Sequence, residues 1–186
     1  CFTSVGGGFQ EAAKETGNGA GPAAAAGEAT VLRGPAGMLA KAMEESRSIP
    51  TATSFRTLAV DALDAKRKAL NGALKERGMK VSFTHLIAWA MVQAATEWPV
   101  MTRTFEEREG KPNAIQPSAV NLGIAVDVER KDGSRGLMVP CIKGAEQVDF
   151  AAFWANYEEL VRKARTGALN ADDFAGTTAT LTNPGT

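Results

Sequence analysis

Apolar residues recur three and four positions apart along four segments of the chain, which is the spacing of an amphipathic helix. In the clearest of them, Phe153, Tyr157 and Leu160 share one face. Residues that commonly cap helices stand at most of the ends, and Asp61 is expected as the N-cap of the second helix. The predicted helices are residues 31–48, 61–77, 82–98 and 149–167.

Other segments are rich in β-branched residues or alternate between apolar and polar positions, which predicts strands. Asp132-Gly133 is typical of a tight hairpin turn between two of them. The predicted strands are residues 51–60, 103–109, 119–128, 136–143 and 177–183.

The order of the main elements is a strand, two helices, a hairpin, a helix and a strand. This order predicts an α/β fold of the two-layer α+β kind, in which helices cover a mixed, largely antiparallel sheet. Strands and helices do not alternate one by one, so a doubly wound nucleotide-binding fold is not expected.

Composition changes sharply near residue 30. Residues 1–30 are dominated by glycine, alanine and threonine, with too few large apolar side chains to offset the entropy of an ordered chain. We therefore predict a flexible linker or arm over residues 1–30 and one domain over residues 31–186. A phosphate-binding loop at Gly6–Gly8 is the alternative, but the flanking strand and the helix with Lys-Ser or Lys-Thr that it requires are not visible.

Charges balance, with 21 Lys and Arg against 21 Asp and Glu, so composition favours neither a nucleic-acid partner nor an acidic tail. No apolar run is long enough to cross a bilayer, so no membrane partner is expected. The start at Cys1 rather than at Met suggests an internal start. With only Cys1 and Cys141, a reducing cytoplasmic compartment is the simplest interpretation.

The only histidine, His85, lies within a predicted helix. We expect a core or boundary histidine whose nitrogens are satisfied locally, because a catalytic base would need a nucleophile and an orienting acid close in space. Asp172 and Asp173 are expected at a turn or helix start, since adjacent side chains do not converge on one substrate.

A solvated helix face is expected for the basic cluster Lys66–Lys68, with a docking surface for an anionic partner as the alternative. The tryptophans are expected in the core rather than as a stacking platform for nucleic acid. They are Trp89, Trp98 and Trp154.

The segment Thr180–Gly185 is a predicted strand that runs into a tight turn. Hydroxyl groups at a rigid strand end can stabilise a developing oxyanion. Threonine, asparagine, proline and glycine are also ordinary turn residues, so these residues alone favour a turn.

Five segments, read together, resemble a known family. They are IPTATSFR (49–56), KVSFTHLIAWAMVQA (80–94), NLGIAVDVERKDG (121–133), GLMVPCIKGAE (136–146) and RKARTGALNADDFAGTTATLTNPGT (162–186). They resemble the catalytic domain of dihydrolipoyl acyltransferases, the core components of 2-oxo acid dehydrogenase complexes. The likeness covers residues 31–186 and is greatest to the domain fused into multifunctional 2-oxoglutarate dehydrogenases of actinobacteria, where a linker precedes a start like Val31–Gly34.

The resemblance implies a chloramphenicol-acetyltransferase-like fold, C-terminally incomplete here, and a homotrimer with active sites between subunits. Coenzyme A and the lipoyl arm of a partner domain would enter opposite ends of a channel. A histidine would deprotonate coenzyme A, the thiolate would attack the acyl thioester of dihydrolipoamide, and a hydroxyl would stabilise the oxyanion. Dihydrolipoamide dehydrogenase is a further implied partner, and thiamine diphosphate and magnesium would belong to the parent chain outside this segment.

By this resemblance the oxyanion donor is Thr182, in the pair Thr182-Asn183. The family's catalytic histidine lies in a His-x-x-x-Asp motif beyond Thr186, and His85 is not its counterpart. The chain alone is therefore not expected to catalyse acyl transfer. Pro184 stands where free-standing acyltransferases have glycine, in agreement with the fused form.

Three functions stay open on the sequence. The chain is part of a succinyltransferase domain, or a non-catalytic trimeric scaffold that organises a fused 2-oxoglutarate dehydrogenase, or a stand-alone domain. The scaffold predicts a defined oligomer without coenzyme A binding. The stand-alone domain predicts cooperative melting, although missing strands would leave a sheet edge exposed.

Overall fold

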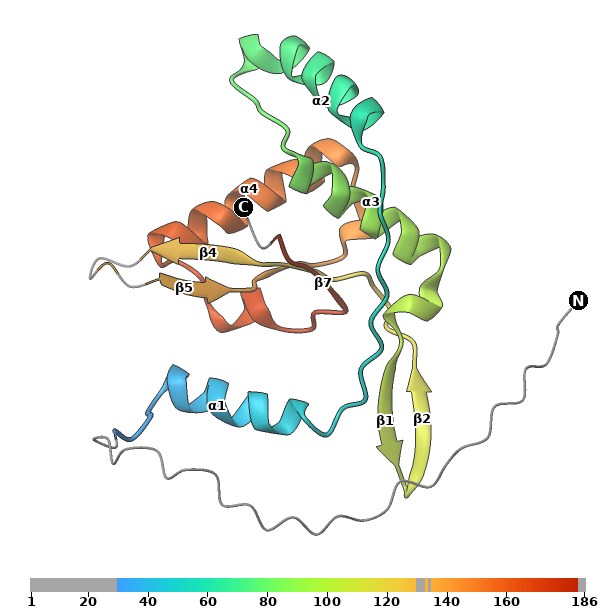
Figure 1. Cartoon of the computed structure of the whole chain (residues 1–186), viewed down its shortest axis with the longest axis vertical. Coiled ribbons are helices and arrows are strands. Elements are labelled where there is room, and N and C mark those ends of the chain that lie inside the picture. The colour runs from blue at the N-terminus through green and yellow to red at the C-terminus, as the bar shows by residue number, and fades with distance from the viewer. Residues whose placement is uncertain (1–29, 130–132, 134, 184–186) are drawn as a thin grey trace, which may run out of the picture. The chain divides into compact units, whose positions relative to one another are not determined.

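The computed structural model describes residues 30–129, 133 and 135–183 (Figure 1). The chain divides into two units, residues 1–56 and residues 57–186. Apart from Thr30, the predicted linker lies outside the described residues, and so do Gly6–Gly8 and Asp132. The division of the chain at residue 30 therefore stays a prediction.

The described part of the first unit holds one helix, α1 (Pro35–Ser46), within the predicted segment. Its large apolar side chains, among them Met38 and Met43, are exposed. The strand predicted over residues 51–60 is wrong, because these residues are exposed and pair with no described strand. A strand needs a neighbour for its N–H and C=O groups, and β-branched residues alone do not supply one.

The second unit contains the other three predicted helices. They are α2 (Asp61–Leu74), α3 (Phe83–Glu97) and α4 (Phe150–Thr166), and the 3-10 helices are Lys75–Arg77, Pro99–Thr102, Ala145–Gln147 and Ala171–Phe174. Ser82 and Asp149, at which two of the predicted helices begin, cap α3 and α4 with their side chains. The expected N-cap at Asp61 is wrong by one residue: Asp61 opens the helix itself, in the first turn, where a carboxylate favourably faces the positive end of the helix dipole.

Seven strands are formed by the described residues, in three small sheets. The central sheet has the order β6 (Cys141–Ile142), β3 (Leu122–Ile124), β7 (Ala179–Leu181). In it, β6 is antiparallel to β3 and β7 is parallel to β3. The other two are the antiparallel pairs β1 (Thr104–Arg108) with β2 (Lys111–Ile115) and β4 (Val126–Glu129) with β5 (Arg135–Met138).

The β1–β2 hairpin was predicted only in its first half. Strand β2 was not predicted because it contains Pro112, and proline is rare inside strands. Glu109 and Gly110 link the strands with positive φ angles of 52° and 70°, the conformation that a two-residue hairpin loop requires. A glutamate-glycine turn before a short polar segment was the signal available in the sequence.

Helices α3 and α4 contact each other and supply buried side chains to the same core as the central sheet (Figure 1). Its most enclosed members include Val92, Leu122, Ile124 and Phe153. Trp89 packs against this core and Trp154 is half-buried, whereas Trp98 is 54% exposed, so the expectation of a core residue is wrong for Trp98. Trp98 directly follows α3, beyond Ala95, which is the last buried residue of the helix.

The central sheet shows different residues on its two faces. Register pairs Leu122 with Ala179 and Ile124 with Leu181, and all four belong to or pack on the core that the helices cover. Gly123 pairs with Thr180 on the opposite face. A side chain at Gly123 would come within 3.0 Å of the Thr180 hydroxyl oxygen and within 2.9 Å of a Thr177 methyl, so close packing requires glycine there.

Among the residues that the structure describes, no helix has both the length and the apolar character needed to cross a bilayer.

Candidate active site

Thr182 directly follows β7, the strand that occupies one edge of the central sheet. The carbonyl of Leu181 accepts a hydrogen bond of 3.1 Å from the amide of Ala125, so the chain is still tied to its neighbour at this point. Because side chains alternate along a strand, Thr182 continues the face of Thr180 and Gly123. Its side chain is exposed. The oxyanion role implied by the resemblance therefore stays a prediction, with the residue at a strand end as expected.

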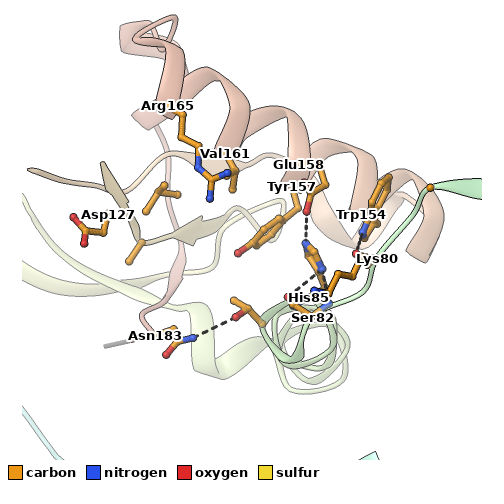
Figure 2. A pocket seen from close by; sticks show the side chains of 14 residues that line it. Lys80, Ser82, His85, Asp127, Trp154, Tyr157, Glu158, Val161, Arg165 and Asn183 are labelled. Atoms are coloured by element: carbon orange, nitrogen blue, oxygen red, sulfur yellow. Dashed lines mark hydrogen bonds and ion pairs between the residues drawn. The ribbon is translucent and has the colours of Figure 1, made fainter. Parts of the chain in front are cut away.

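A cavity of about 600 Å³ lies beside the strand end, lined by residues from the first turn of α3, from α4 and from the start of β4 (Figure 2). Asn183 is the part of the strand end that lines it, and its amide donates a 3.4 Å hydrogen bond to the hydroxyl of Thr84 in the first turn of α3. Thr182 is not among the lining residues. The side chains of Thr182 and Asn183 thus lie on opposite sides of the sheet.

His85 is the most enclosed polar residue of this cavity, with 3% of its surface exposed. Its Nδ1 accepts a 3.0 Å hydrogen bond from the backbone N–H of Ser82, so the ring proton sits on Nε2. Nε2 lies 3.0 Å from Oε1 of Glu158, without the alignment of a regular hydrogen bond. The ring also meets Tyr157 edge-on at 4.2 Å between centroids.

The protonation of this group follows from its surroundings. Burial lowers the pKa of His85 below its ordinary value, and the carboxylate of Glu158 opposes that shift. Burial also raises the pKa of Tyr157, with Glu158 adding to the effect. Both side chains are therefore neutral near pH 7. Burial confirms the expected core or boundary position of His85, but local satisfaction is confirmed for Nδ1 alone, because Nε2 lacks a regular hydrogen bond. Its contacts lie on the helix side of the sheet, away from the face of Thr182.

The other candidates are structural. Asp172 and Asp173 lie in the predicted helix start, where Asn170 and Asp173 cap each other's backbone N–H groups. Lys143 and Lys163 form ion pairs with the two aspartates. These contacts account for both carboxylates.

The basic cluster on α2 is partly neutralised within the helix. Arg67 and Lys68 both pair with Asp64, at 2.7 Å each, and the guanidinium of Arg67 stacks over Phe83 at 4.4 Å. Lys66 is exposed, as a solvated face predicts. Among the described residues no group of three His, Cys, Asp or Glu could hold a metal ion, and Cys141 is buried as a free thiol.

The catalytic-domain model of the 2-oxoacid dehydrogenase acyltransferases matches residues 26–186 of this chain. The chain belongs to that acyltransferase family. The match confirms the resemblance carried by the five segments.

Relatives with the same stretch of sequence are long enzymes. The multifunctional 2-oxoglutarate metabolism enzyme of Mycolicibacterium vanbaalenii is 49% identical over 160 residues, which cover 86% of this chain and 13% of that protein. The enzyme of the same name from Mycobacterium sp. strain JLS is 50% identical over 157 residues, covering 84% of this chain and 12% of that protein. The acyltransferase domain described here thus spans a small part of its relatives' length.

Solved acyltransferases share the fold. The dihydrolipoamide acetyltransferase of Azotobacter vinelandii, studied for the role of a serine, a histidine and an asparagine in its catalytic mechanism, aligns with a TM-score of 0.66 and 27% identity. The cubic core of a pyruvate dehydrogenase multienzyme complex aligns with a TM-score of 0.65 and 28% identity. In both cases 83% of this chain and 62% of the solved chain are covered. The predicted acyltransferase fold is confirmed.

Sequence reasoning missed Thr84 and Asn183 as partners. The available signal was alternation: if Thr182 faces one side of the sheet, the next residue must face the helices.

Proposed function

We propose that this chain is part of the succinyltransferase domain of a 2-oxoglutarate dehydrogenase, which passes a succinyl group from dihydrolipoamide to coenzyme A. The observation that carries the proposal is the 49–50% identity of this acyltransferase domain to enzymes named for 2-oxoglutarate metabolism. Loss of carbon dioxide from 2-oxoglutarate leaves a four-carbon succinyl unit, so succinyl is the acyl group that such a domain receives.

In the proposed reaction, the thiolate of coenzyme A adds to the carbonyl carbon of the succinyl thioester. The carbonyl oxygen takes up the negative charge, and the hydroxyl of Thr182 donates a hydrogen bond to it. The tetrahedral intermediate then collapses, the bond to the dihydrolipoamide sulfur breaks, and that sulfur is protonated. A hydroxyl at the end of a hydrogen-bonded strand suits this task because it is fixed before charge develops.

The base that deprotonates coenzyme A is proposed to come from a histidine outside this chain. His85 does not fit the role, because it is enclosed against Glu158 and Tyr157 on the other side of the sheet. An exposed Thr182 also needs a second surface to exclude water from the oxyanion. We therefore propose a homotrimer in which a neighbouring subunit covers this face and brings the base.

The wider setting is proposed from membership of the acyltransferase family and, for the compartment, from the small number of cysteines. A lipoyl domain would deliver the acyl group, dihydrolipoamide dehydrogenase would reoxidise the lipoyl arm, and the compartment would be the cytoplasm. Thiamine diphosphate and magnesium would act in a decarboxylase part of the longer protein.

The test uses the protein encoded by the complete reading frame, assayed for succinyl-coenzyme A formed from succinyl-dihydrolipoamide and coenzyme A. Thr182→Ala should lower kcat by about a hundredfold or more, the usual cost of one oxyanion donor. Thr182→Ser keeps the hydroxyl and should retain most activity. A loss below about threefold in Thr182→Ala would discredit the oxyanion role.

A non-catalytic scaffold gives a different result. In that case light scattering would show a defined oligomer, titration with coenzyme A would show no binding, and the assay would show no product. That combination would refute the transferase proposal.

A further inference from the structure

The two residues at the end of β7 point to opposite sides of the central sheet. Thr182 continues the face of Gly123 and Thr180, whereas Asn183 lines the cavity on the helix side. Thr182 and Asn183 are consecutive, so the same stretch of backbone orients both side chains. A contact that fixes Asn183 therefore also limits where the Thr182 hydroxyl points.

Asn183 is held by a residue far away in the sequence. Its Nδ2 donates to the hydroxyl oxygen of Thr84, 99 residues earlier, at 3.4 Å (Figure 2). The bond joins the open end of the strand to the first turn of α3. A backbone hydrogen bond also holds the strand one residue before Thr182, at the carbonyl of Leu181.

The first turn of α3 is a firm place for such an anchor. Ser82 and His85 cap each other across it, and His85 reaches Glu158 on α4. The indole of Trp154 on the same helix donates a 3.0 Å hydrogen bond to the carbonyl of Lys80, just before the turn. The turn therefore contacts α4 through His85 and is hydrogen-bonded to it just upstream, at Lys80.

A third tie comes from α2. Asn71 uses both ends of its amide on Val81, donating to its carbonyl at 2.9 Å and accepting from its N–H at 2.7 Å. Val81 is 1% exposed, so this pair of bonds is largely shielded from water. Thr84 thus stands on a turn that is tied to both neighbouring helices.

We propose that Thr84 and Asn183 are positioning residues for acyl transfer: their hydrogen bond holds the end of β7 so that the Thr182 hydroxyl points at the oxyanion. This inference rests on the proposed function. Neither residue touches substrate in this scheme, and both act through Thr182.

The kinetic test uses Thr84→Val in the complete protein, which keeps the shape of the side chain and removes the hydroxyl. It should lower kcat by about two- to tenfold, the range that one ordinary hydrogen bond contributes, and leave both KM values unchanged. Thr84→Ser restores the hydroxyl and should restore kcat. In a Thr182→Ala background, Thr84→Val should have no further effect, because nothing is left to position.

A second measurement does not depend on activity. Backbone order parameters from nitrogen relaxation of this chain should fall at Thr182 in Thr84→Val and stay at the original value in Thr84→Ser, while Val92 in the middle of α3 serves as an internal control. Unchanged order at Thr182 would overturn the inference even if the protein proved inactive.

Failure of the two proposals can be told apart. If Thr182→Ala leaves kcat unchanged, the oxyanion role fails. If Thr182→Ala is costly but Thr84→Val is silent, or remains costly in the Thr182→Ala background, the positioning role alone is refuted.

Discussion

The two faces of the central sheet are built differently, although the same strands form both. On the helix side, Leu122, Ile124 and Leu181 belong to or pack against the core. On the other side the backbone is approached closely at Gly123, and the strand end presents the exposed hydroxyl of Thr182. The core therefore lies on one face of the sheet and the candidate catalytic hydroxyl on the other. Substitutions on the helix side should mainly lower stability, whereas substitution of Thr182 should mainly lower activity.

The largest effect is expected on the helix side. Phe153 is fully enclosed, so Phe153→Ala should lower the free energy of unfolding by about 3–5 kcal/mol through lost burial and the cavity left behind. Urea denaturation measures it. Phe105 on the β1–β2 hairpin is 73% exposed, and Phe105→Ala should change stability by about 0.5 kcal/mol or less. Equal losses in the two variants would contradict this assignment of the core.

A smaller loss is expected from crowding on the opposite face. Gly123→Ala should destabilise by about 1–3 kcal/mol, because the new methyl group meets Thr177 and Thr180. Gly72 in α2 has open space around it, so Gly72→Ala should instead stabilise by about 0.5–1 kcal/mol. Thermal or urea unfolding compares the pair, and a gain in stability for Gly123→Ala would show that this face is looser than described.

Asp149 is the N-cap of α4, the helix that supplies Phe153 to the core, so its substitution tests a contact at the edge of the helix side. The Asp149 carboxylate accepts a 2.8 Å hydrogen bond from the N–H of Ala152, so Asp149→Ala should cost about 1 kcal/mol. Asp149→Asn keeps an accepting oxygen and should lose much less. If the two variants unfold at the same urea concentration, the capping bond contributes nothing to stability.

The smallest expected effect is the dependence of stability on pH through His85, because burial lowers the pKa of His85 while Glu158 raises it. The folded-state pKa lies below 6.5, so between the two values the unfolded chain binds a proton that the folded chain does not. The stability that His85 contributes is full above pH 6.5 and is lost as pH falls through the folded pKa. His85→Asn should flatten that decline between pH 6.5 and the range where carboxylates titrate.

The measurement is direct because the chain has one histidine. Its ring proton signals can be followed by NMR across the pH range, beside urea denaturation of both proteins. A folded-state pKa at or above 6.5 would show that Glu158 outweighs burial.

Local chemistry explains which elements the sequence predicted. The ends of α3 and α4 were predictable from Ser82, Asp149 and Gly167, because capping depends on neighbouring backbone groups. The strand predicted over residues 51–60 was wrong, since strand formation depends on a partner strand elsewhere in the chain. The sequence pattern also ran β3 and β4 together, because only the paired neighbours reveal the break at Ala125.

The candidate site was less accessible to such reasoning. Taken alone, the residue types around Thr182 favour a turn. Only the family resemblance identified the Thr182 hydroxyl as an oxyanion donor. The bond from Asn183 to Thr84 spans 99 residues and leaves no trace in local periodicity. The ion-pair distance between His85 and Glu158 likewise depends on how two helices meet.

The parallel pairing of β3 with β7 has a consequence for biosynthesis. Asn121, beside β3, bonds to Thr178, beside β7, across 57 residues, while the β4–β5 hairpin and α4 lie between them in the sequence. Hairpins and helices form from near neighbours within microseconds, whereas distant pairings are slow. As the chain leaves the ribosome, α4 is therefore available to shield the sheet before the segment bearing Thr182 emerges, and that segment joins the sheet after α4.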